Sequence, residues 1–410
     1  MQTSGKFRAR VTAGIGLAGA AATVTALVAT PAQGQTGEIE LSGTKTAVAD
    51  SYIVVLKDGA TGVPARAANA VQALTRTATG LVDRYDASLS KTFGKALNGF
   101  SIHATKAEAE RLAADGSVKS VIQNQRVHMT DDQANPPSWG LDRIDQPDLP
   151  LDQNYTYNTP ADNVTAYVID TGVRASHATF EGRVQGGKDF VDNDDDPNDE
   201  QGHGTHVAGT IGGKEYGVAK GVKIVPVRVL DANGSGTTEQ VVAGIDWVAQ
   251  NAQGPSVANM SLGGPADEAL DQAVSGAIES GVSFAVAAGN ESSDAGGSSP
   301  ARVPEAITVA ASNDQDNQAD FSNFGEVVDL YAPGEDIVSA SNSSDDAKET
   351  LSGTSMAAPH VAGGAALFLA NNPDATPQQV SEGLTSSAAQ DKIQNPSEGT
   401  PNRLLNTVGQ

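Results

Sequence analysis

The sequence predicts a large α/β domain, with a mostly parallel sheet flanked by helices, preceded by a small α+β domain. Beyond residue 138, short apolar runs alternate with longer helical patterns. Continuous apolar strands separated by helices are typical of parallel sheets covered on both faces. The length of 410 residues exceeds that of one small domain and is sufficient to bury a large core.

The predicted strands of the large domain are apolar runs bounded by polar or turn residues. They span residues 164–170, 222–230, 257–262, 282–288, 307–311 and 327–331. A helix at 237–252 opens with the capping box Thr237-x-x-Gln240, and another is predicted at 267–280. A further helix follows Thr376, an N-cap residue placed directly before a proline.

The small domain is predicted at residues 51–129 from a βαββαβ-like pattern. Its strands are expected at 51–57, 99–104 and 117–127, and its helices at 64–86 and 106–114. A leader linker at residues 33–50 precedes it. The polar segment 130–137 ends in two prolines and is predicted to be a protease-sensitive processing linker before the large domain at 138–410.

Residues 1–32 have the pattern of a secretory signal peptide. Lys6, Arg8 and Arg10 precede a charge-free run at 11–31, and small residues then lead to a cleavage site after Ala32. A membrane anchor is the alternative. The run is rich in Ala, Gly and Thr rather than Leu, Ile and Phe, which disfavours a membrane span.

Charge and cysteine content narrow the classes of function. Residues 1–129 carry 14 Lys and Arg against 9 Asp and Glu, whereas residues 130–410 carry 12 against 41. Such an acidic large domain argues against binding to nucleic acid or anionic membranes and favours solubility or cation binding. The chain has no cysteine, which excludes disulfides and thiol catalysis.

Three segments far apart in the chain each hold one residue type of a nucleophilic triad. Asp170 ends a predicted strand, His203 stands in Gly-His-Gly-Thr-His, and Ser355 stands in Gly-Thr-Ser-Met-Ala-Ala-Pro-His. A serine hydroxyl is a poor nucleophile at neutral pH. It needs an imidazole to take its proton and a carboxylate to hold that imidazole in one tautomer.

Each residue also has a simpler interpretation. Asp170 alone would be a turn residue, and Ser355 alone would be an N-cap. His203 and His206 could form a metal pair, but no third ligand motif completes such a site. Ala357 replaces the last glycine of a Gly-x-Ser-x-Gly elbow, which counts against an α/β-hydrolase.

With the order Asp, His, Ser and these flanking residues, the chain resembles subtilisin-like serine proteases, most closely the proteinase K-like branch, over residues 138–406. The resemblance implies that Ser355 is the nucleophile, His203 the base, Asp170 its orienting partner and Asn290 an oxyanion donor. It also implies that residues 51–129 are a ferredoxin-like propeptide, which assists folding and then transiently inhibits the cleft.

Two glycine-rich edges resemble the family's substrate-binding segments. They would pair with an extended polypeptide as neighbouring strands, and a specificity pocket would lie between Ser261–Gly264 and 287–289. Those walls contain no acidic residue, which favours apolar or aromatic side chains over Lys or Arg. The predicted binding residues are Gly234, Ser235, Gly236, Ser261, Leu262, Gly263, Gly264, Ala288 and Gly289.

The resemblance also implies structural Ca²⁺, with no cofactor for catalysis. One implied site uses the carbonyls of Pro304 and Ala306 with Asp329. The acidic run at 192–199 is either a further cation site or a solvated loop. A second implied site offers the oxygen ligands that Ca²⁺ prefers, on Asp142, Asp145, Gln146, Asp152 and Asn154.

The sequence therefore predicts a secreted, extracellular, monomeric serine endopeptidase made as a self-processing zymogen, free of membrane contact once the signal is removed. An esterase could use the same acyl chemistry, although the peptide-binding edges disfavour it. A non-enzymatic binding protein on the same scaffold is the third possibility. Such proteins usually lose a triad member or the oxyanion Asn, and all four residues are present.

Overall fold

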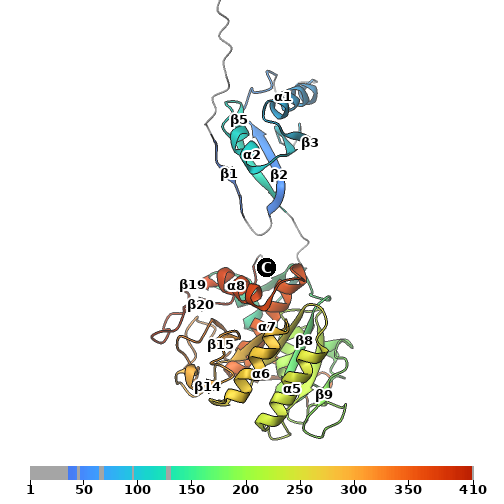
Figure 1. Ribbon diagram of the computed structural model, residues 1–410, viewed down its shortest axis with the longest axis vertical. Coiled ribbons are helices and arrows are strands. Elements are labelled where there is room, and N and C mark those ends of the chain that lie inside the picture. The colour runs from blue at the N-terminus through green and yellow to red at the C-terminus, as the bar shows by residue number, and fades with distance from the viewer. Residues whose placement is uncertain (1–35, 44–46, 64–68, 95–96, 126–130, 409–410) are drawn as a thin grey trace, which may run out of the picture. The chain divides into compact units, whose positions relative to one another are not determined.

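The computed structural model describes residues 36–43, 47–63, 69–94, 97–125 and 131–408. The chain forms two compact units, Met1–Val127 and His128–Gln410 (Figure 1). The predicted signal peptide, residues 1–32, lies outside the described residues.

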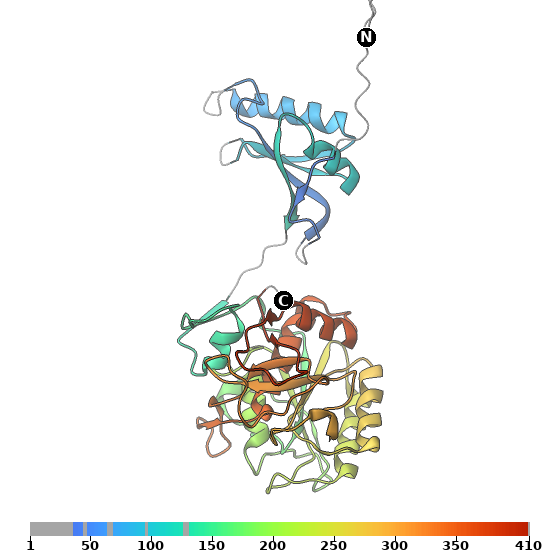
Figure 2. The same cartoon turned by 90° about the vertical axis from the view of Figure 1, so that its left-hand side faces the viewer.

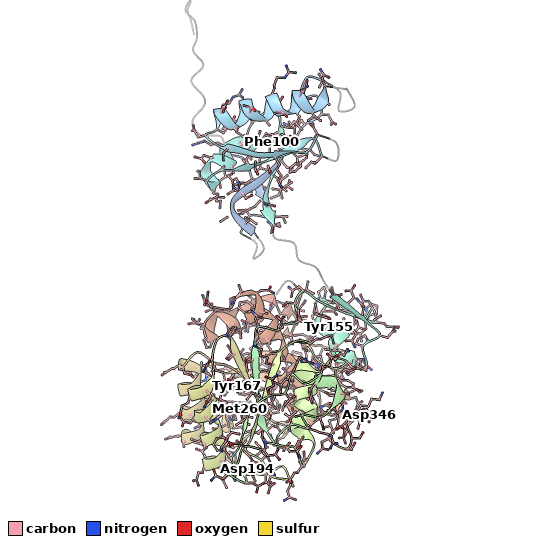
Figure 3. All side chains as sticks on the ribbon, turned by 90° about the vertical axis from the view of Figure 1, so that its right-hand side faces the viewer. Phe100, Tyr155, Tyr167, Asp194, Met260 and Asp346 are labelled. Carbon is pink, nitrogen blue, oxygen red and sulfur yellow. The ribbon has the colours of Figure 1, made fainter. Side chains whose placement is uncertain are left out.

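The first unit is a five-stranded sheet with two helices, which contains one strand more than the predicted βαββαβ-like pattern. The sheet has the order β1-β5-β2-β4-β3. Its helix α1 and sheet are visible in Figure 2, and Phe100 lies inside its core in Figure 3. The elements are β1 Ile39–Glu40, β2 Ala47–Leu56, α1 Ala70–Arg84, β3 Ser88–Thr92, β4 Gly99–His103, α2 Lys106–Ala113 and β5 Val118–Gln125.

Two elements of the first unit differ from the sequence prediction. The segment predicted to be a leader contains β1 and the start of β2, because β1 pairs in parallel with β5. Strand β3 was not predicted, since Leu89 is its one apolar residue. Its place at the sheet edge, paired only with β4, explains this polar sequence.

The second unit is built on a nine-stranded sheet of order β19-β20-β16-β15-β13-β11-β8-β10-β9. From β16 to β9 all neighbouring strands are parallel, which confirms the predicted fold class. The strands are β8 Thr165–Asp170, β9 Lys188–Asp189, β10 Lys223–Arg228, β11 Ser256–Met260, β13 Ser283–Ala287, β15 Ile307–Ser312, β16 Leu330–Pro333, β19 Ala389–Gln390 and β20 Arg403–Leu404.

Side chains of the central strand alternate between two buried faces. Ala166 and Val168 join the core beneath α4 and α7, whereas Tyr167 and Ile169 join the core beneath α5 and α6. Figure 1 shows α5 and α6 packed side by side, and Figure 3 places Tyr167 and Met260 in the interior. The helices are α3 Trp139–Ile144, α4 His203–Gly212, α5 Thr238–Asn251, α6 Glu268–Glu279, α7 Thr354–Asn371 and α8 Pro377–Ser387.

Both predicted capping residues, Thr237 and Thr376, make capping boxes.

Several short elements lie around the large sheet. Two 3₁₀ helices lie at Ala178–Phe180 and Ala295–Gly297. In the ranges that the structure describes, no helix has the length and apolarity to span a membrane. The short strands are β6 Asp131–Ala134, β7 Asn154–Tyr157, β12 Gly264–Pro265, β14 Ser298–Ser299, β17 Ile337–Ala340 and β18 Lys348–Leu351.

The predicted processing linker is partly a strand. Residues 131–134 form β6, which pairs antiparallel with β7. The Gln133 side chain donates to the carbonyl of Glu215 at 2.9 Å and accepts from Lys220 Nζ at 2.6 Å. These contacts come from residues more than eighty positions away, so the local polar sequence gives no sign of them.

A buried ion pair ties α3 to the loop after β15. Arg143 has no exposed area, and its Nε and Nη2 donate to Asp316 Oδ1 and Oδ2 at 2.7 and 3.0 Å. Burying two charges is tolerated because the fork of the guanidinium matches the carboxylate. Removing one partner would leave an unpaired buried charge.

Asp316→Asn should therefore lower the free energy of unfolding by about 3–5 kcal/mol. Asparagine keeps the shape and tolerates the left-handed backbone at this position, where φ is 60°. Urea unfolding measures the loss. The control is Asp195→Asn, which breaks an exposed pair with Lys188 and should cost at most about 1 kcal/mol. Equal losses in the two variants would contradict the assignment.

Candidate active site

The three triad candidates meet at one edge of the parallel sheet. Asp170 is the last residue of the central strand β8, His203 is the first residue of α4, and Ser355 is the second residue of α7. Functional groups of open α/β sheets collect at the carboxyl ends of the strands. The fold thus brings together two residues 33 positions apart and a third from near the C-terminus.

Asp170 and His203 form a close pair. The Asp170 carboxylate has no solvent exposure, and its two oxygens lie 2.8 and 3.0 Å from His203 Nδ1. The backbone N–H of Thr171 also donates to Asp170 at 2.7 Å. A proton on Nδ1 is required for this contact, so the neutral imidazole keeps Nε2 free as a proton acceptor.

Electrostatics raise the proton affinity of the His203 imidazole. Burial by itself lowers the pKa of His203, but the charge and hydrogen bond of Asp170, with a smaller contribution from Asp199, outweigh it. The pKa of His203 is therefore raised above its ordinary value of about 6.5. The side chain keeps 24% of its surface exposed, which leaves it accessible to substrate.

Ser355 is placed at the site, but its hydroxyl is not directed at His203. It donates to the carbonyl oxygen of Ser261 at 3.2 Å, and no hydrogen bond joins these two described residues, Ser355 and His203. Catalytic hydrogen bonds often tighten only when substrate binds. Rotation of the serine side chain is therefore part of any reaction at this site.

The carbonyl of Ser355 is held by a contact that sequence reasoning missed. In a regular helix it would accept from the N–H four residues later, but that residue is Pro359, which has none. The hydroxyl of Ser261 donates to this carbonyl at 2.8 Å instead, and Asn259 donates to Ser261 at 2.9 Å. A proline four residues after the serine was the available signal.

Asn290 and the Ser355 N–H face a common space. The Asn290 Oδ1 accepts from the N–H and hydroxyl of Thr354 at 2.8 and 3.0 Å, which leaves Nδ2 as a donor. A Cβ atom on Gly353 would lie 3.6 Å from both Asn290 Nδ2 and Ser355 N. Two donors therefore converge beside a glycine, at the N-terminus of α7, where the helix dipole favours negative charge.

Two pockets adjoin the triad and contain the predicted substrate-binding residues. One of about 380 Å³ is lined by Ala288, Gly289 and Ser355. Another of about 750 Å³ is lined by His203, residues 234–236 and Ser261. Both include residues 262–264, so the pockets lie on the two sides of one glycine-rich edge.

The first pocket corrects one expectation. Its predicted walls lack acidic residues, but Glu291 also lines it. The Glu291 Oε2 accepts from the N–H of Asn290 at 2.9 Å and from Asn323 Nδ2 at 2.8 Å. The carboxylate lies beyond the end of the predicted wall, which is why inspection of the wall segments missed it.

The second histidine of the Gly-His-Gly-Thr-His motif, His206, lies inside the protein. His206 is fully buried, and its Nε2 lies 3.1 Å from the carbonyl of Ile337. Burial lowers the pKa of His206 to about 4, so it stays neutral. In the described part of the chain, no three His, Asp or Glu side chains are grouped to hold a metal ion.

Hydrogen bonds link four of the five residues of the longer implied calcium site, all but Asp145, although its three carboxylates are not arranged to hold a metal ion. Asp142 accepts from the N–H groups of Asp152 and Gln153, Gln146 Oε1 accepts from Asp152 N–H, and the Asn154 N–H donates to Asp152. Asp145 Oδ1 is buried without any partner, and burial raises the pKa of Asp145 to about 7.

At the other two implied cation positions, carboxylates already have partners within the protein. Asp329 is half-buried, accepts from the N–H of Thr308 at 2.8 Å, and has a pKa raised to about 6 by burial. Pro304 and Ala306 precede β15 in the adjoining turn. Within the acidic run at 192–199, Asp192 pairs with Arg228 and Asp195 with Lys188, so the run is an ion-paired loop.

Comparison with known proteins places the chain in a family. A model described as the Subtilase family matches residues 161–409, and one described as Peptidase inhibitor I9 matches residues 51–130. The chain is 46% identical to "Extracellular serine proteinase" of Thermus sp. (strain Rt41A) over 94% of this chain and 96% of that protein.

Two further relatives agree. "Alkaline serine exoprotease A" of Vibrio alginolyticus is 46% identical over 88% of this chain and 67% of that protein. A crystal structure of a cold adapted subtilisin-like serine proteinase shares 58% identity at a TM-score of 0.65, covering 66% of this chain and 98% of that one. The chain belongs to the subtilase family and is a subtilisin-like serine endopeptidase with an I9 inhibitor domain ahead of its protease domain.

Proposed function

We propose that this protein is a secreted endopeptidase, made as a self-processing zymogen, in which Ser355 is the nucleophile. The observation that carries the proposal is the hydrogen-bonded Asp170–His203 pair at the carboxyl end of β8, the sheet edge at which Ser355 begins α7 beside Asn290. Secretion is supported by the pattern of residues 1–32 and by a relative named as extracellular.

The proposed reaction uses two half-reactions. Ser355 Oγ attacks the carbonyl carbon of the scissile peptide bond while His203 Nε2 takes the hydroxyl proton. The tetrahedral intermediate then collapses, and His203 returns that proton to the leaving amine. Water, activated by the same imidazole, hydrolyses the acyl-enzyme and restores Ser355. Asp170 stabilises the imidazolium in both halves.

The oxyanion of the tetrahedral intermediate would be held by Asn290 Nδ2 and the Ser355 N–H. Asn290 is preorganised because its own oxygen is fixed by Thr354. The donors act on charge that develops only during reaction, which is the most effective use of a fixed hydrogen-bond donor.

Extended polypeptide is the proposed substrate, preferably with an apolar or aromatic side chain in the first pocket. The glycine-rich edges at 234–236 and 261–264 line the second pocket, and their glycines let the backbone of a peptide strand approach closely. Glu291 is the acidic group of that pocket, but one of its oxygens is already engaged by Asn290 and Asn323.

We propose that residues 51–129 act as a transient inhibitor and folding aid, with the mature protease beginning between Arg126 and Asn135, at the junction with the linker at 130–137. The I9 match over residues 51–130 supports this division. Because β6 already pairs within the second unit, cleavage that retains residues 131–134 would leave this ribbon intact.

Bound Ca²⁺ is the proposed stabiliser of the mature enzyme. The buried Asp145 Oδ1 lacks a donor, and a cation held with Asp142, Gln146, Asp152 and Asn154 would satisfy it. Asp329 with the carbonyls of Pro304 and Ala306 is the second proposed site. When bound, Ca²⁺ would neutralise carboxylates that have too few protein donors, and each step of the proposed reaction is carried by Ser355, His203, Asp170 and Asn290.

Ser355→Ala should abolish casein hydrolysis and leave the 33–410 precursor intact, because no other group can form the acyl-enzyme. Wild-type protein should instead begin between Arg126 and Asn135. N-terminal sequencing and gel analysis of secreted protein measure both effects. Ser275→Ala, on the distant helix α6, is the matched control and should mature normally. Efficient maturation of purified Ser355→Ala would refute self-processing.

Asn290→Ala should lower kcat by about 10²–10³-fold with little change in KM, because the lost donor acts on the transition state. That magnitude is the one known for subtilisin rather than a new estimate. Steady-state kinetics on a chromogenic peptide provide the measurement. Retention of wild-type kcat would remove Asn290 from the oxyanion site.

Chelation should shorten the half-life of activity at elevated temperature without changing initial rates. A ligand that binds only the folded state adds about 2.7 kcal/mol at a hundredfold excess over Kd. Asp145→Ala and Asp329→Ala should each reduce the protection given by millimolar calcium, whereas Asp195→Ala, in an exposed pair, should not. Identical inactivation with chelator and with calcium would contradict both sites.

A further inference from the structure

Asp199 is a buried carboxylate that the proposed reaction does not use. It precedes α4 by four residues, and only 4% of its surface is exposed. Five donors reach it, all from protein. Oδ1 accepts from Thr171 Oγ1 at 2.9 Å and from the N–H groups of Gln201 and Gly202 at 2.9 and 2.7 Å. Oδ2 accepts from the N–H and hydroxyl of Thr205 at 2.9 and 2.6 Å.

These donors belong to the two elements that carry the catalytic pair. Thr171 directly follows Asp170 at the end of β8, whereas Gly202 directly precedes His203 and Thr205 lies in the first turn of α4. Thr171 Oγ1 also accepts from the N–H of Gly204 at 2.9 Å. The Asp199 carboxylate is thus hydrogen-bonded both to the residue that follows β8 and to residues at the start of α4.

These hydrogen bonds hold the start of α4 unusually close to the end of β8. A Cβ atom on Gly204 would lie 2.1 Å from the carbonyl oxygen of Gly172 and 3.2 Å from Asp170 Cβ. Gly202 adopts a φ of 113°, a region that favours glycine. The helix start is therefore pressed against the strand end, and small displacements there would change the Asp170–His203 geometry.

We infer that Asp199 is a positioning residue for the proposed reaction: by hydrogen bonding to both elements, it fixes α4 against the end of β8 and holds His203 in register with Asp170. This inference rests on the proposed role of His203 as the general base. A misplacement of about 1 Å at a reacting group can cost 10²-fold in rate, so such a device has a measurable effect.

The charge of Asp199 provides a second, separable readout. Asp170 is the dominant charge facing His203, Asp199 adds to it, and the buried His206 stays neutral. In Asp199→Asn, one side-chain oxygen becomes an NH₂ group that faces donors. A backbone N–H of Gln201, Gly202 or Thr205 then loses its acceptor, because these groups cannot turn.

The test compares Asp199→Asn with two other variants of the full chain. Thr171→Val keeps the charge but breaks the link between the carboxylate and β8. Asp189→Asn is the matched control, because Asp189 is 1% exposed and accepts from Val191, Asp192 and Arg228 without touching β8 or α4. Matured protein is quantified by titration with a serine-directed phosphonate.

Asp199→Asn should lower kcat by about 10²-fold with little change in KM, and should move the acidic limb of the kcat/KM profile to lower pH. Thr171→Val should lower kcat without moving that limb. Asp189→Asn should lower the thermal midpoint but keep both kcat and the limb. A folded Asp199→Asn precursor that does not mature counts as loss of catalysis and supports the inference.

Wild-type kcat and an unmoved acidic limb in Asp199→Asn would overturn the inference. If Asp199→Asn fails to fold, Thr171→Val decides: wild-type kcat there overturns the inference, and a lower kcat with unchanged KM supports it. Failure of the proposed function is a different result, since Ser355→Ala would then remain active.

Discussion

A carboxylate with no solvent exposure must be neutralised or hydrogen-bonded, and in this protein Asp170 meets that requirement through His203 and the Thr171 N–H. The requirement can be met only if the first residue of α4 comes within hydrogen-bonding distance of the end of β8. The surrounding sheet keeps the end of β8 in place for this contact. Strand β8 lies among other buried strands, so its end is fixed from both faces.

The contact between Asp170 and His203 also restricts the neighbouring segments. Close approach of α4 requires glycine at 204, where any side chain would collide with the Gly172 carbonyl. At α7, Pro359 leaves the Ser355 carbonyl without a partner in the helix, and the Ser261 hydroxyl donates to it, which joins the start of α7 to the wall of the second pocket. Two contacts therefore fix the candidate residues, Asp170 with His203 and Ser261 with Ser355.

Much of this was predictable from sequence where the signal is local. Apolar runs located the sheet, capping residues located Thr237 and Thr376, and the short motifs located Asp170, His203 and Ser355. The missed features depend on contacts between distant segments. Glu291 lines the first pocket although it lies outside the predicted wall segments. Residues 131–134 form β6 because they pair with β7, and Asp199 is linked to the end of β8 through its hydrogen bond with Thr171. The Ser355 hydroxyl direction is likewise set by Ser261 rather than by its own motif.

The central claim is that Ser355 is a nucleophile activated by His203, and covalent labelling tests it most directly. A serine-directed phosphonate is added to wild-type protein and to His203→Ala, both matured by the same added protease that is then removed, and the adduct is located by peptide mass spectrometry. The account predicts one adduct per chain, on Ser355, and at least a 10²-fold slower labelling rate in His203→Ala, since removal of the general base forfeits its share of rate enhancement. An adduct on another serine, or wild-type labelling of Ser355 in His203→Ala, would contradict the account.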